Sequence, residues 1–350
     1  MHASNTHPID RSSSITAPPD PIRGTEHMAT PPNNADANAL AQVRHRSMRL
    51  SEISMHIAEM GEGPTVIFLH GFPELWYSWR HQLVALAAAG YRAVAPDQRG
   101  YGGSSVPTEV ADYDITHLTR DIIDLIDSLG ASRVTLVGHD FGALVGWAIA
   151  LRHPDRIDGV AALSVPYVPR TPVRPTEFFR QLMGDDFYML WLQQPGAADS
   201  AFAADIERAI AGRWVTDRHG WQSVAPPPRF PWRSAEDQHV YIDALQRNGF
   251  TGPLNWYRNF DRNWEILAPY DGATIDCPAI FVAGGDDPVL RFMPPSVMDG
   301  YVTDLQVSAI LPGFNHWIQE EAPSVVNRYL LDFLQRIHTD DTTTGGKTAI

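Results

Sequence analysis

Short apolar segments recur along the chain and alternate with segments that have the periodicity of amphipathic helices. The apolar segments are residues 65–69, 93–95, 134–137, 159–163, 279–283 and 307–311. Continuous apolar strands separated by helices are typical of a parallel sheet that is buried on both faces. Residues 43–49 and 53–60 alternate instead, which predicts an antiparallel hairpin at the sheet's edge. The pattern predicts an α/β fold, a mostly parallel sheet flanked by helices.

One helical segment is defined at both of its ends. Apolar residues at positions 115, 118, 122, 125, 126 and 129 share one helical face. Asp114 is placed to cap the start of this helix, and Gly130 is placed to end it. These signals predict a crossover helix between the second and third apolar segments.

The strand–helix alternation stops between residues 167 and 264. Proline-rich pieces and aromatic-rich helical segments replace it, which predicts a mainly helical cap inserted into the α/β core. The core then has two parts, residues 39–166 and 265–337. Residues 1–38 are rich in Pro, Ser, Thr and Asn and lack a signal-peptide core, so we expect a disordered leader there. Residues 338–350 are polar, and we expect a frayed tail.

Composition and charge exclude several classes of protein. A formal net charge of -14, without a Lys/Arg-rich stretch, argues against nucleic-acid binding. No segment approaches the roughly 20 apolar residues that span a bilayer, so we expect a soluble, cytoplasmic protein without a membrane partner. The single cysteine, Cys277, makes neither an intrachain disulfide nor a cysteine metal site, and the 14 histidines lack zinc-like spacing. We therefore expect no metal.

The pentapeptide Gly-His-Asp-Phe-Gly at residues 138–142 follows an apolar segment and precedes a helical one. Small residues two before and two after Asp140 allow strand and helix to pack around a strained turn. This is the pattern of a nucleophile elbow with aspartate in the serine position. A carboxylate nucleophile forms an ester by displacing a leaving group from carbon, which suits carbon–oxygen or carbon–halogen bonds. The pentapeptide alone fits equally an aspartate that only caps the following helix.

An ester on Asp140 requires a base that activates water. In this type of site the acid and the histidine follow the nucleophile in the chain. Asp287 follows residues 279–283 and two glycines, and His316 follows the last apolar segment. Both positions are at the carboxyl ends of strands, where open α/β sheets bind ligands. Asp286 is adjacent and is the alternative acid.

The tetrapeptide His-Gly-Phe-Pro at residues 70–73 directly follows the first buried segment. Its glycine permits a turn that points a backbone amide inward. The N–H groups of Phe72 and Phe141 then form a candidate oxyanion hole. An ordinary Gly-Pro loop is the alternative for this tetrapeptide alone.

Taken together, these motifs resemble those of the soluble epoxide hydrolases of the α/β-hydrolase fold. The resemblance rests on residues 70–73, 97–102 (Asp-Gln-Arg-Gly-Tyr-Gly), 138–142 and 313–317 (Gly-Phe-Asn-His-Trp), and it spans residues 43–334. Residues 187–196 and 254–259 are similar to the two stretches in which that family carries its ring-opening tyrosines. This likeness implies that Tyr188 and Tyr257 have that role, and it favours Asp287 over Asp286.

The resemblance implies an epoxide hydrolase that needs no cofactor and no metal. Asp140 would open the epoxide to an ester, and water activated by His316 and Asp287 would release a vicinal diol. The aromatic content of the cap predicts a lipophilic or aromatic epoxide as substrate, with Trp191, Trp256 and Trp317 in contact with it. A homodimer is also an open expectation.

Two other functions fit the same fold. One is a haloalkane dehalogenase, but members of that group use a tryptophan after the nucleophile to hold halide, and this chain has Phe141 there. The other is a non-catalytic binding protein, which has no need for an intact set of nucleophile, base, acid and tyrosines. Asn315 stands where glycine is usual, a departure that concerns substrate shape more than reaction type.

Overall fold

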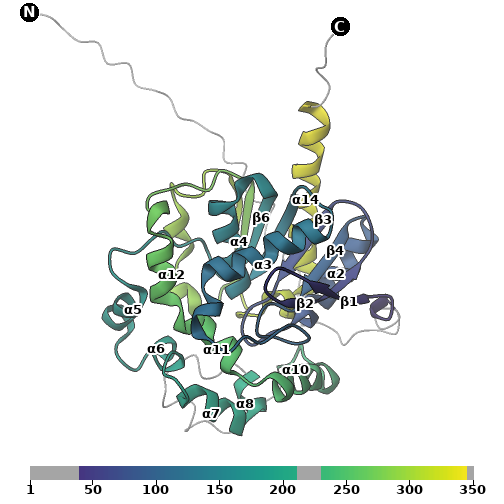
Figure 1. Ribbon diagram of the computed structural model, residues 1–350. Helices are drawn as coiled ribbons and strands as arrows, with labels where there is room; N and C mark the ends of the chain where they lie inside the picture. Colours follow the sequence, from purple (N-terminus) through teal and green to yellow (C-terminus); the bar gives the residue numbers. More distant parts are fainter. Residues whose placement is uncertain (1–38, 211–229, 345–350) are drawn as a thin grey trace, which may run out of the picture.

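A single eight-stranded sheet forms the centre of the molecule (Figure 1). The computed structural model describes residues 39–210 and 230–344, with side chains as far as residue 339. Strands β3 to β8 are parallel, whereas β1 and β2 form the antiparallel hairpin predicted at the edge. The strand order is β1-β2-β4-β3-β5-β6-β7-β8. The strands are β1 (Arg44–Arg49), β2 (Ser54–Met60), β3 (Thr65–Leu69), β4 (Arg92–Pro96), β5 (Val134–His139), β6 (Ile157–Leu163), β7 (Ala279–Gly284) and β8 (Leu305–Leu311).

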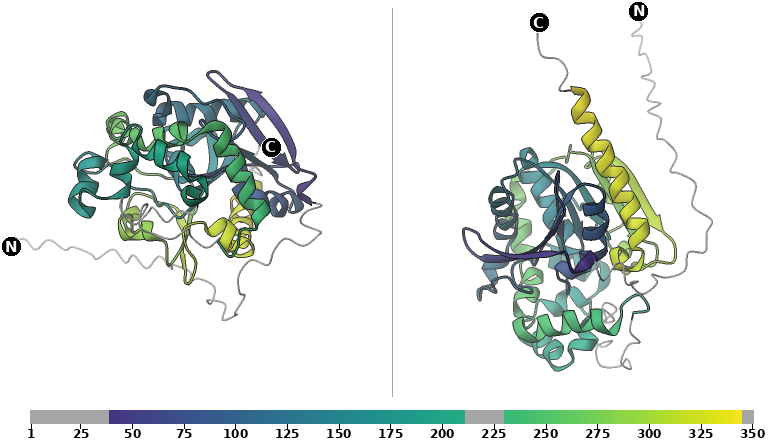
Figure 2. Two further views of the ribbon diagram at one scale, coloured as in Figure 1. Left: turned by 90° about the horizontal axis from the view of Figure 1, so that it is seen from below. Right: turned by 90° about the vertical axis from the view of Figure 1, so that its right-hand side faces the viewer.

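Helices cover both faces of the sheet, as its continuous apolar strands predict. Helices α3 (Ile115–Ser128) and α4 (Phe141–Arg152) pack on one face. Helices α2 (Arg80–Ala88) and α14 (Pro323–Thr344) pack on the other (Figure 2). Each face has its own cluster of buried apolar side chains, so the fold is a three-layer α/β sandwich.

The crossover helix α3 has both predicted ends. Asp114 Oδ1 accepts hydrogen bonds from the N–H groups of Thr116, at 2.9 Å, and His117, at 3.2 Å. Gly130, just beyond the helix, has a φ of 71°, a conformation that favours glycine. The capping prediction for this helix is therefore confirmed.

Between β6 and β7 the chain leaves the sheet and forms a group of helices that we call the cap. The cap helices gather beside one end of the sheet (Figure 1). They are α5 (Pro175–Met183), α6 (Tyr188–Leu192), α7 (Ala197–Ala204), α8 (Ile206–Ile210), α10 (Ala235–Asn248), α11 (Thr251–Arg258) and α12 (Phe260–Ile266). The remaining helix is α13 (Ile318–Glu321), and short 3₁₀ helices are η1 (Trp76–Trp79), η2 (Val110–Tyr113), η3 (Pro154–Arg156), η5 (Ala268–Tyr270), η6 (Pro288–Arg291) and η7 (Pro295–Met298).

The predictions for the two ends of the chain, a leader and a frayed tail, have different outcomes. The leader predicted for residues 1–38 lies outside the described residues. Helix α14 continues to Thr344, through the first part of the predicted frayed tail. None of the described helices is long and apolar enough to cross a membrane.

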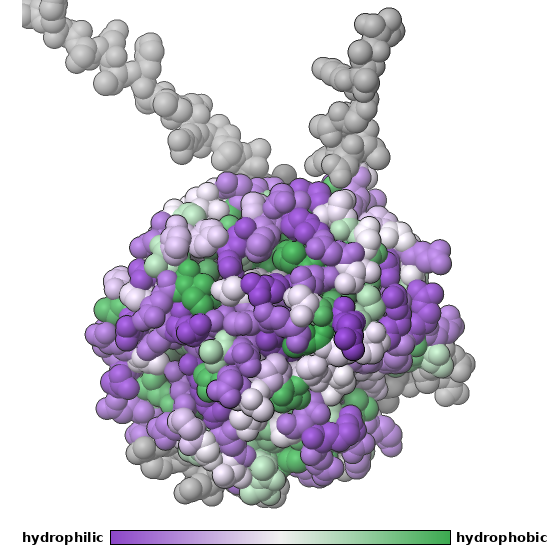
Figure 3. Space-filling view, viewed as in Figure 1, coloured by the Kyte–Doolittle hydropathy of each residue, from purple (hydrophilic) through white to green (hydrophobic). Residues whose placement is uncertain are grey.

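On the face shown in Figure 3, hydrophilic side chains predominate and apolar ones form small, separated patches. The homodimer expected from the sequence stays a prediction.

Candidate active site

Asp140 occupies the turn between β5 and α4, at the carboxyl end of a central strand. Its φ of 52° and ψ of -120° are a strained combination for a residue with a side chain. A Cβ atom on Gly142 would overlap the Leu69 carbonyl oxygen, and one on Gly138 would overlap the Gly142 carbonyl oxygen. The two glycines therefore permit the close packing that holds this turn.

The Asp140 carboxylate contacts a different group at each oxygen. Oδ1 accepts a hydrogen bond from the Phe72 N–H at 2.9 Å. Oδ2 lies 3.6 Å from Nε2 of His316. Phe141 is the first residue of α4, so its N–H belongs to the first turn, whose amides have no acceptor within the helix. The Phe72 amide thus comes from the loop after β3, and the Phe141 amide comes from the first turn of α4, directly after Asp140.

Asp287 lies in the loop after β7 and faces His316. Its Oδ2 lies 2.9 Å from Nδ1 of His316, and its Oδ1 accepts a hydrogen bond from the Val289 N–H at 2.9 Å. The backbone bond fixes the orientation of the carboxylate. Asp287 is buried, whereas Asp286 is exposed. Of the two adjacent acids, Asp287 is the one that the fold brings to the histidine.

Two carboxylates act on the protonation of His316. Burial alone would lower its pKa, but the negative charges of Asp287 and Asp140 outweigh this effect and raise the pKa well above the usual value. In the free protein, the raised pKa favours the protonated imidazolium over the neutral ring. Nδ1 donates to Asp287, and Nε2 points toward Asp140.

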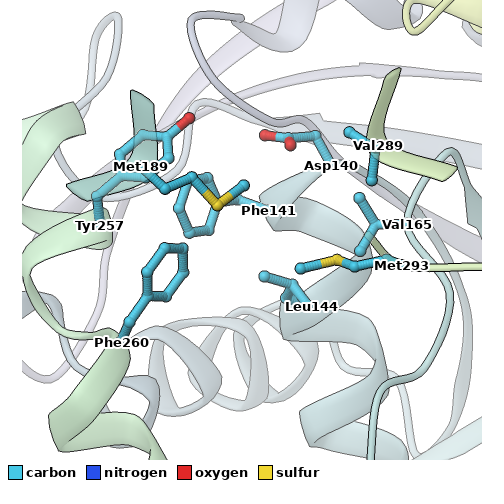
Figure 4. A pocket seen from close by; sticks show the side chains of 9 residues that line it. All are labelled: Asp140, Phe141, Leu144, Val165, Met189, Tyr257, Phe260, Val289 and Met293. Atoms are coloured by element: carbon cyan, nitrogen blue, oxygen red, sulfur yellow. The ribbon is translucent and has the colours of Figure 1, made fainter. Parts of the chain in front are cut away.

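Tyr188 and Tyr257 come from two cap helices, α6 and α11, and both are buried. Burial and the charge of Asp140 raise the pKa of both phenols well above the usual value. Their hydroxyl groups therefore remain protonated donors. In Figure 4 the Tyr257 hydroxyl and the Asp140 carboxylate point toward each other across a shared space.

That space opens into a pocket whose walls are almost entirely apolar (Figure 4). Asp140 and Tyr257 are the only polar side chains among its lining residues. The others are Phe141, Leu144, Val165, Met189, Phe260, Val289 and Met293. Of these, the sequence singled out only Phe141; Phe260 and the aliphatic and thioether residues were not predicted. Their apolar periodicity fits ordinary core positions, so it gave no signal of a pocket.

The three predicted substrate-binding tryptophans lie outside the lining of this pocket. Trp256 is buried behind it, and its indole N–H donates to the Arg99 carbonyl oxygen at 3.1 Å. Trp191 packs against another aromatic ring of the cap. Trp317 contacts His316, with ring centroids 5.2 Å apart. Contact of these side chains with substrate stays a prediction.

The structure also reveals a buried support beneath the histidine that sequence reasoning missed. The His316 carbonyl oxygen lies 2.8 Å from Nε2 of His139 and accepts a hydrogen bond from the Ser164 hydroxyl at 2.6 Å. Nδ1 of His139 lies 2.7 Å from the Glu74 carboxylate. Burial alone would raise the pKa of Glu74, but His139 and the Gly71 amide lower it to about 2. Glu74 directly follows residues 70–73, yet no local pattern pairs it with His139.

The sheet, the strained turn and the Asp140, His316 and Asp287 side chains define an α/β hydrolase. A family model described as alpha/beta hydrolase fold matches residues 64–323. The chain is 46% identical over 303 residues to epoxide hydrolase A of Mycobacterium tuberculosis, covering 81% of this chain and 94% of the relative. It is 39% identical over 315 residues to epoxide hydrolase 3 of Siraitia grosvenorii, covering 84% and 99%.

Solved structures of epoxide hydrolases are also similar to this chain. An epoxide hydrolase from Vigna radiata superposes with a TM-score of 0.80 at 39% identity, covering 85% of this chain and 98% of that one. Epoxide hydrolase A from Mycobacterium thermoresistibile superposes with a TM-score of 0.79 at 45% identity, covering 84% and 98%. The chain belongs to the epoxide hydrolase family of the α/β-hydrolase fold.

Proposed function

We propose that this enzyme converts small-molecule epoxides to vicinal diols through a covalent ester on Asp140. One observation carries the proposal: the Asp140 carboxylate faces the Tyr257 hydroxyl on one side and the His316–Asp287 pair on the other. A nucleophile, a proton donor and a base are thus gathered at the end of one apolar pocket.

Ring opening requires attack on carbon and acid assistance at oxygen. Asp140 Oδ2 attacks a ring carbon, because Oδ1 is held by the Phe72 amide. The carbon–oxygen bond of the epoxide breaks, and the oxygen takes a proton from a phenol. Tyr257 and Tyr188 supply this assistance. A protonated phenol stabilises the developing alkoxide more strongly than it stabilises the neutral ether oxygen of the unreacted epoxide.

Ester hydrolysis depends on the His316–Asp287 pair. Once Asp140 is esterified, it carries no charge, and one of the two effects that raise the pKa of His316 disappears. The pKa of His316 then falls, and its proton passes through solvent to the phenolate that ring opening left behind. The neutral ring can then accept a proton from water. The resulting hydroxide attacks the Asp140 carboxyl carbon, and the Phe72 and Phe141 amides stabilise the oxyanion. The acyl carbon–Oδ2 bond breaks, Oδ2 takes the proton that His316 received from water, and Oδ2 leaves in the diol.

The pocket lining points to the substrate class. Phe141, Leu144, Phe260 and Met293 surround the space beside the reacting carboxylate, and none of them offers a hydrogen bond to a polar substituent. A charged group placed there would lose its hydration without compensation. The substrate is therefore a neutral epoxide with a lipophilic or aromatic substituent.

Heavy-oxygen water tests the mechanism. With enzyme in excess over styrene oxide, the diol of the first turnover should carry no heavy oxygen from water, and the peptide that contains Asp140 should carry it. Heavy oxygen in the first diol, with none in that peptide, would show that water attacks the epoxide directly. A parallel assay of bromide release from a bromoalkane of similar size should remain negative, which separates this enzyme from a dehalogenase.

Replacing both tyrosines should damage ring opening far more than replacing either one. We expect Tyr188→Phe or Tyr257→Phe to slow ester formation about 10- to 100-fold, because one phenol remains, and the double change to slow it more than about 1,000-fold. Rapid-quench mass spectrometry of the ester measures this. Tyr270→Phe is the control, because Tyr270 is a partly exposed tyrosine of η5, outside the helices α6 and α11 that carry the two ring-opening candidates. Small and independent effects of the two changes would reject their paired role.

A further inference from the structure

A buried group of four charges joins the cap to the segment just after His316. We call it the Glu320 cluster, and it consists of Arg80, Arg233, Asp237 and Glu320. Glu320 Oε2 accepts from Arg80 at 2.6 Å, and its Oε1 accepts from Arg233 at 2.5 Å. Arg80 Nε lies 3.4 Å from Asp237 Oδ1. These side chains are at most 6% exposed.

The members of the cluster come from separate parts of the fold. Arg80 begins α2 in the core, and Glu320 lies in α13, four residues after His316. Asp237 is in the first turn of cap helix α10, and Arg233 directly precedes that helix. Each oxygen of Glu320 thus binds an arginine, one from the core and one from the cap.

An aromatic layer makes a second connection at the same place. Trp317, the residue after His316, packs against Phe230 and Trp232, with ring centroids 5.0 and 6.4 Å apart. The Arg233 guanidinium lies 4.9 Å from the centroid of Trp232 and 5.4 Å from that of Phe230. Arg233 therefore makes two contacts. It packs on the aromatic rings that contact Trp317, and it binds the carboxylate of Glu320.

We propose that Arg233 is a positioning residue of the cap that holds the His316 loop in the geometry needed for ester hydrolysis. This inference rests on the proposed function. Arg233 itself touches none of the reacting groups described above. It acts through Trp317, the residue next to His316, and through Glu320, which lies in the helix α13 that follows.

The geometry assigns this effect to one of the two chemical steps. Ring opening uses Asp140, which is held by its own turn and the Phe72 amide, and the tyrosines of α6 and α11. None of these residues belongs to the Glu320 cluster, so we expect ring opening to depend little on Arg233. His316 Nε2 is 3.6 Å from Asp140 Oδ2, and a small shift of its loop changes the direction in which it accepts a proton. Removing Arg233 also leaves Glu320 Oε1 buried without its ion-pair partner.

A second, more exposed ion pair between cap and core provides a control. Arg262 of α12 lies 2.8 Å from the Asp114 carboxylate at the start of α3. It joins cap to core as Arg233 does, but it contacts neither the His316 loop nor the pocket lining. A general loosening of the cap should follow from losing either arginine, whereas a shift of His316 should follow from losing Arg233 alone.

The test is to measure ester formation and ester decay separately in Arg233→Met, Arg262→Met and the wild type. With styrene oxide, rapid-quench mass spectrometry of the intact protein gives both rates. Arg233→Met should slow ester decay at least about tenfold while ester formation stays within twofold. In steady state kcat should fall with KM, and kcat/KM should change little. Arg262→Met should keep the wild-type ratio of the two rates.

Arg233→Lys distinguishes positioning from loss of folding. It keeps the charge without the planar fork that joins Glu320 to the aromatic layer, so it should recover part of the rate of ester decay. If Arg233→Met does not fold, Arg233→Lys alone should still show slower decay with normal formation. Equal slowing of both steps, or unchanged decay in the folded variants, would overturn the inference. Absence of ester both in the wild type and in His316→Gln would instead refute the proposed function.

Discussion

Asp140→Asn is expected to lower the rate of diol formation by a factor on the order of 10,000 or more, since an amide oxygen does not displace an alkoxide from carbon. Asparagine has the shape of aspartate, tolerates the φ of 52° and still accepts the Phe72 amide bond at Oδ1. The folded structure should therefore survive. Diol formation from styrene oxide measures the loss, with thermal unfolding as the check on folding.

The control for this variant is Asp286→Asn. Asp286 is an exposed carboxylate at the same edge of the sheet, next to the buried Asp287, and its replacement should leave turnover unchanged. Intact-mass analysis must show that residue 140 is still asparagine, because water activated by His316 can hydrolyse the amide back to aspartate. Near-normal turnover by a verified Asp140→Asn protein would eliminate the covalent mechanism.

His316→Gln should trap the enzyme as its ester. Ring opening needs Asp140 and the tyrosines, so the ester should form, but glutamine is no base and its hydrolysis should slow by about 1,000-fold or more. The intact protein should gain the mass of one epoxide molecule, on the peptide that contains Asp140. Steady diol formation at the wild-type rate would show that another group activates water.

The wild-type enzyme should show the same trapping at low pH. Asp287 still raises the pKa of His316 when Asp140 is esterified, so acid protonates the ring and removes the base. The fraction of enzyme present as ester should rise as pH falls through the pKa of His316 in the ester. In His316→Gln that fraction should not depend on pH over the same range. The comparison tests the base directly, because only the wild type has the titrating ring.

Some features follow from the sequence because they depend on nearby residues. Apolar runs predicted the buried strands, alternating residues predicted the edge hairpin, and Asp114 predicted the start of α3. The elbow around Asp140 is equally local, since its two glycines are part of the turn itself. The order of nucleophile, acid and histidine located His316 and the pair of candidate acids. Family resemblance added the two tyrosines and the choice of Asp287 over Asp286.

Contacts between distant segments were decided by the tertiary structure alone. His139 and Glu74 are 65 positions apart, and Arg233 and Glu320 are 87 apart. Neither pair has a local pattern, because a buried polar contact requires only that two side chains meet in the folded state. The pocket is similar: Leu144, Val165 and Met293 have the apolar character of core residues, and only the packing of cap on core makes them its walls. Local chemistry determined the fold and its reactive turn, whereas three-dimensional packing decided what supports His316 and what shape of epoxide fits.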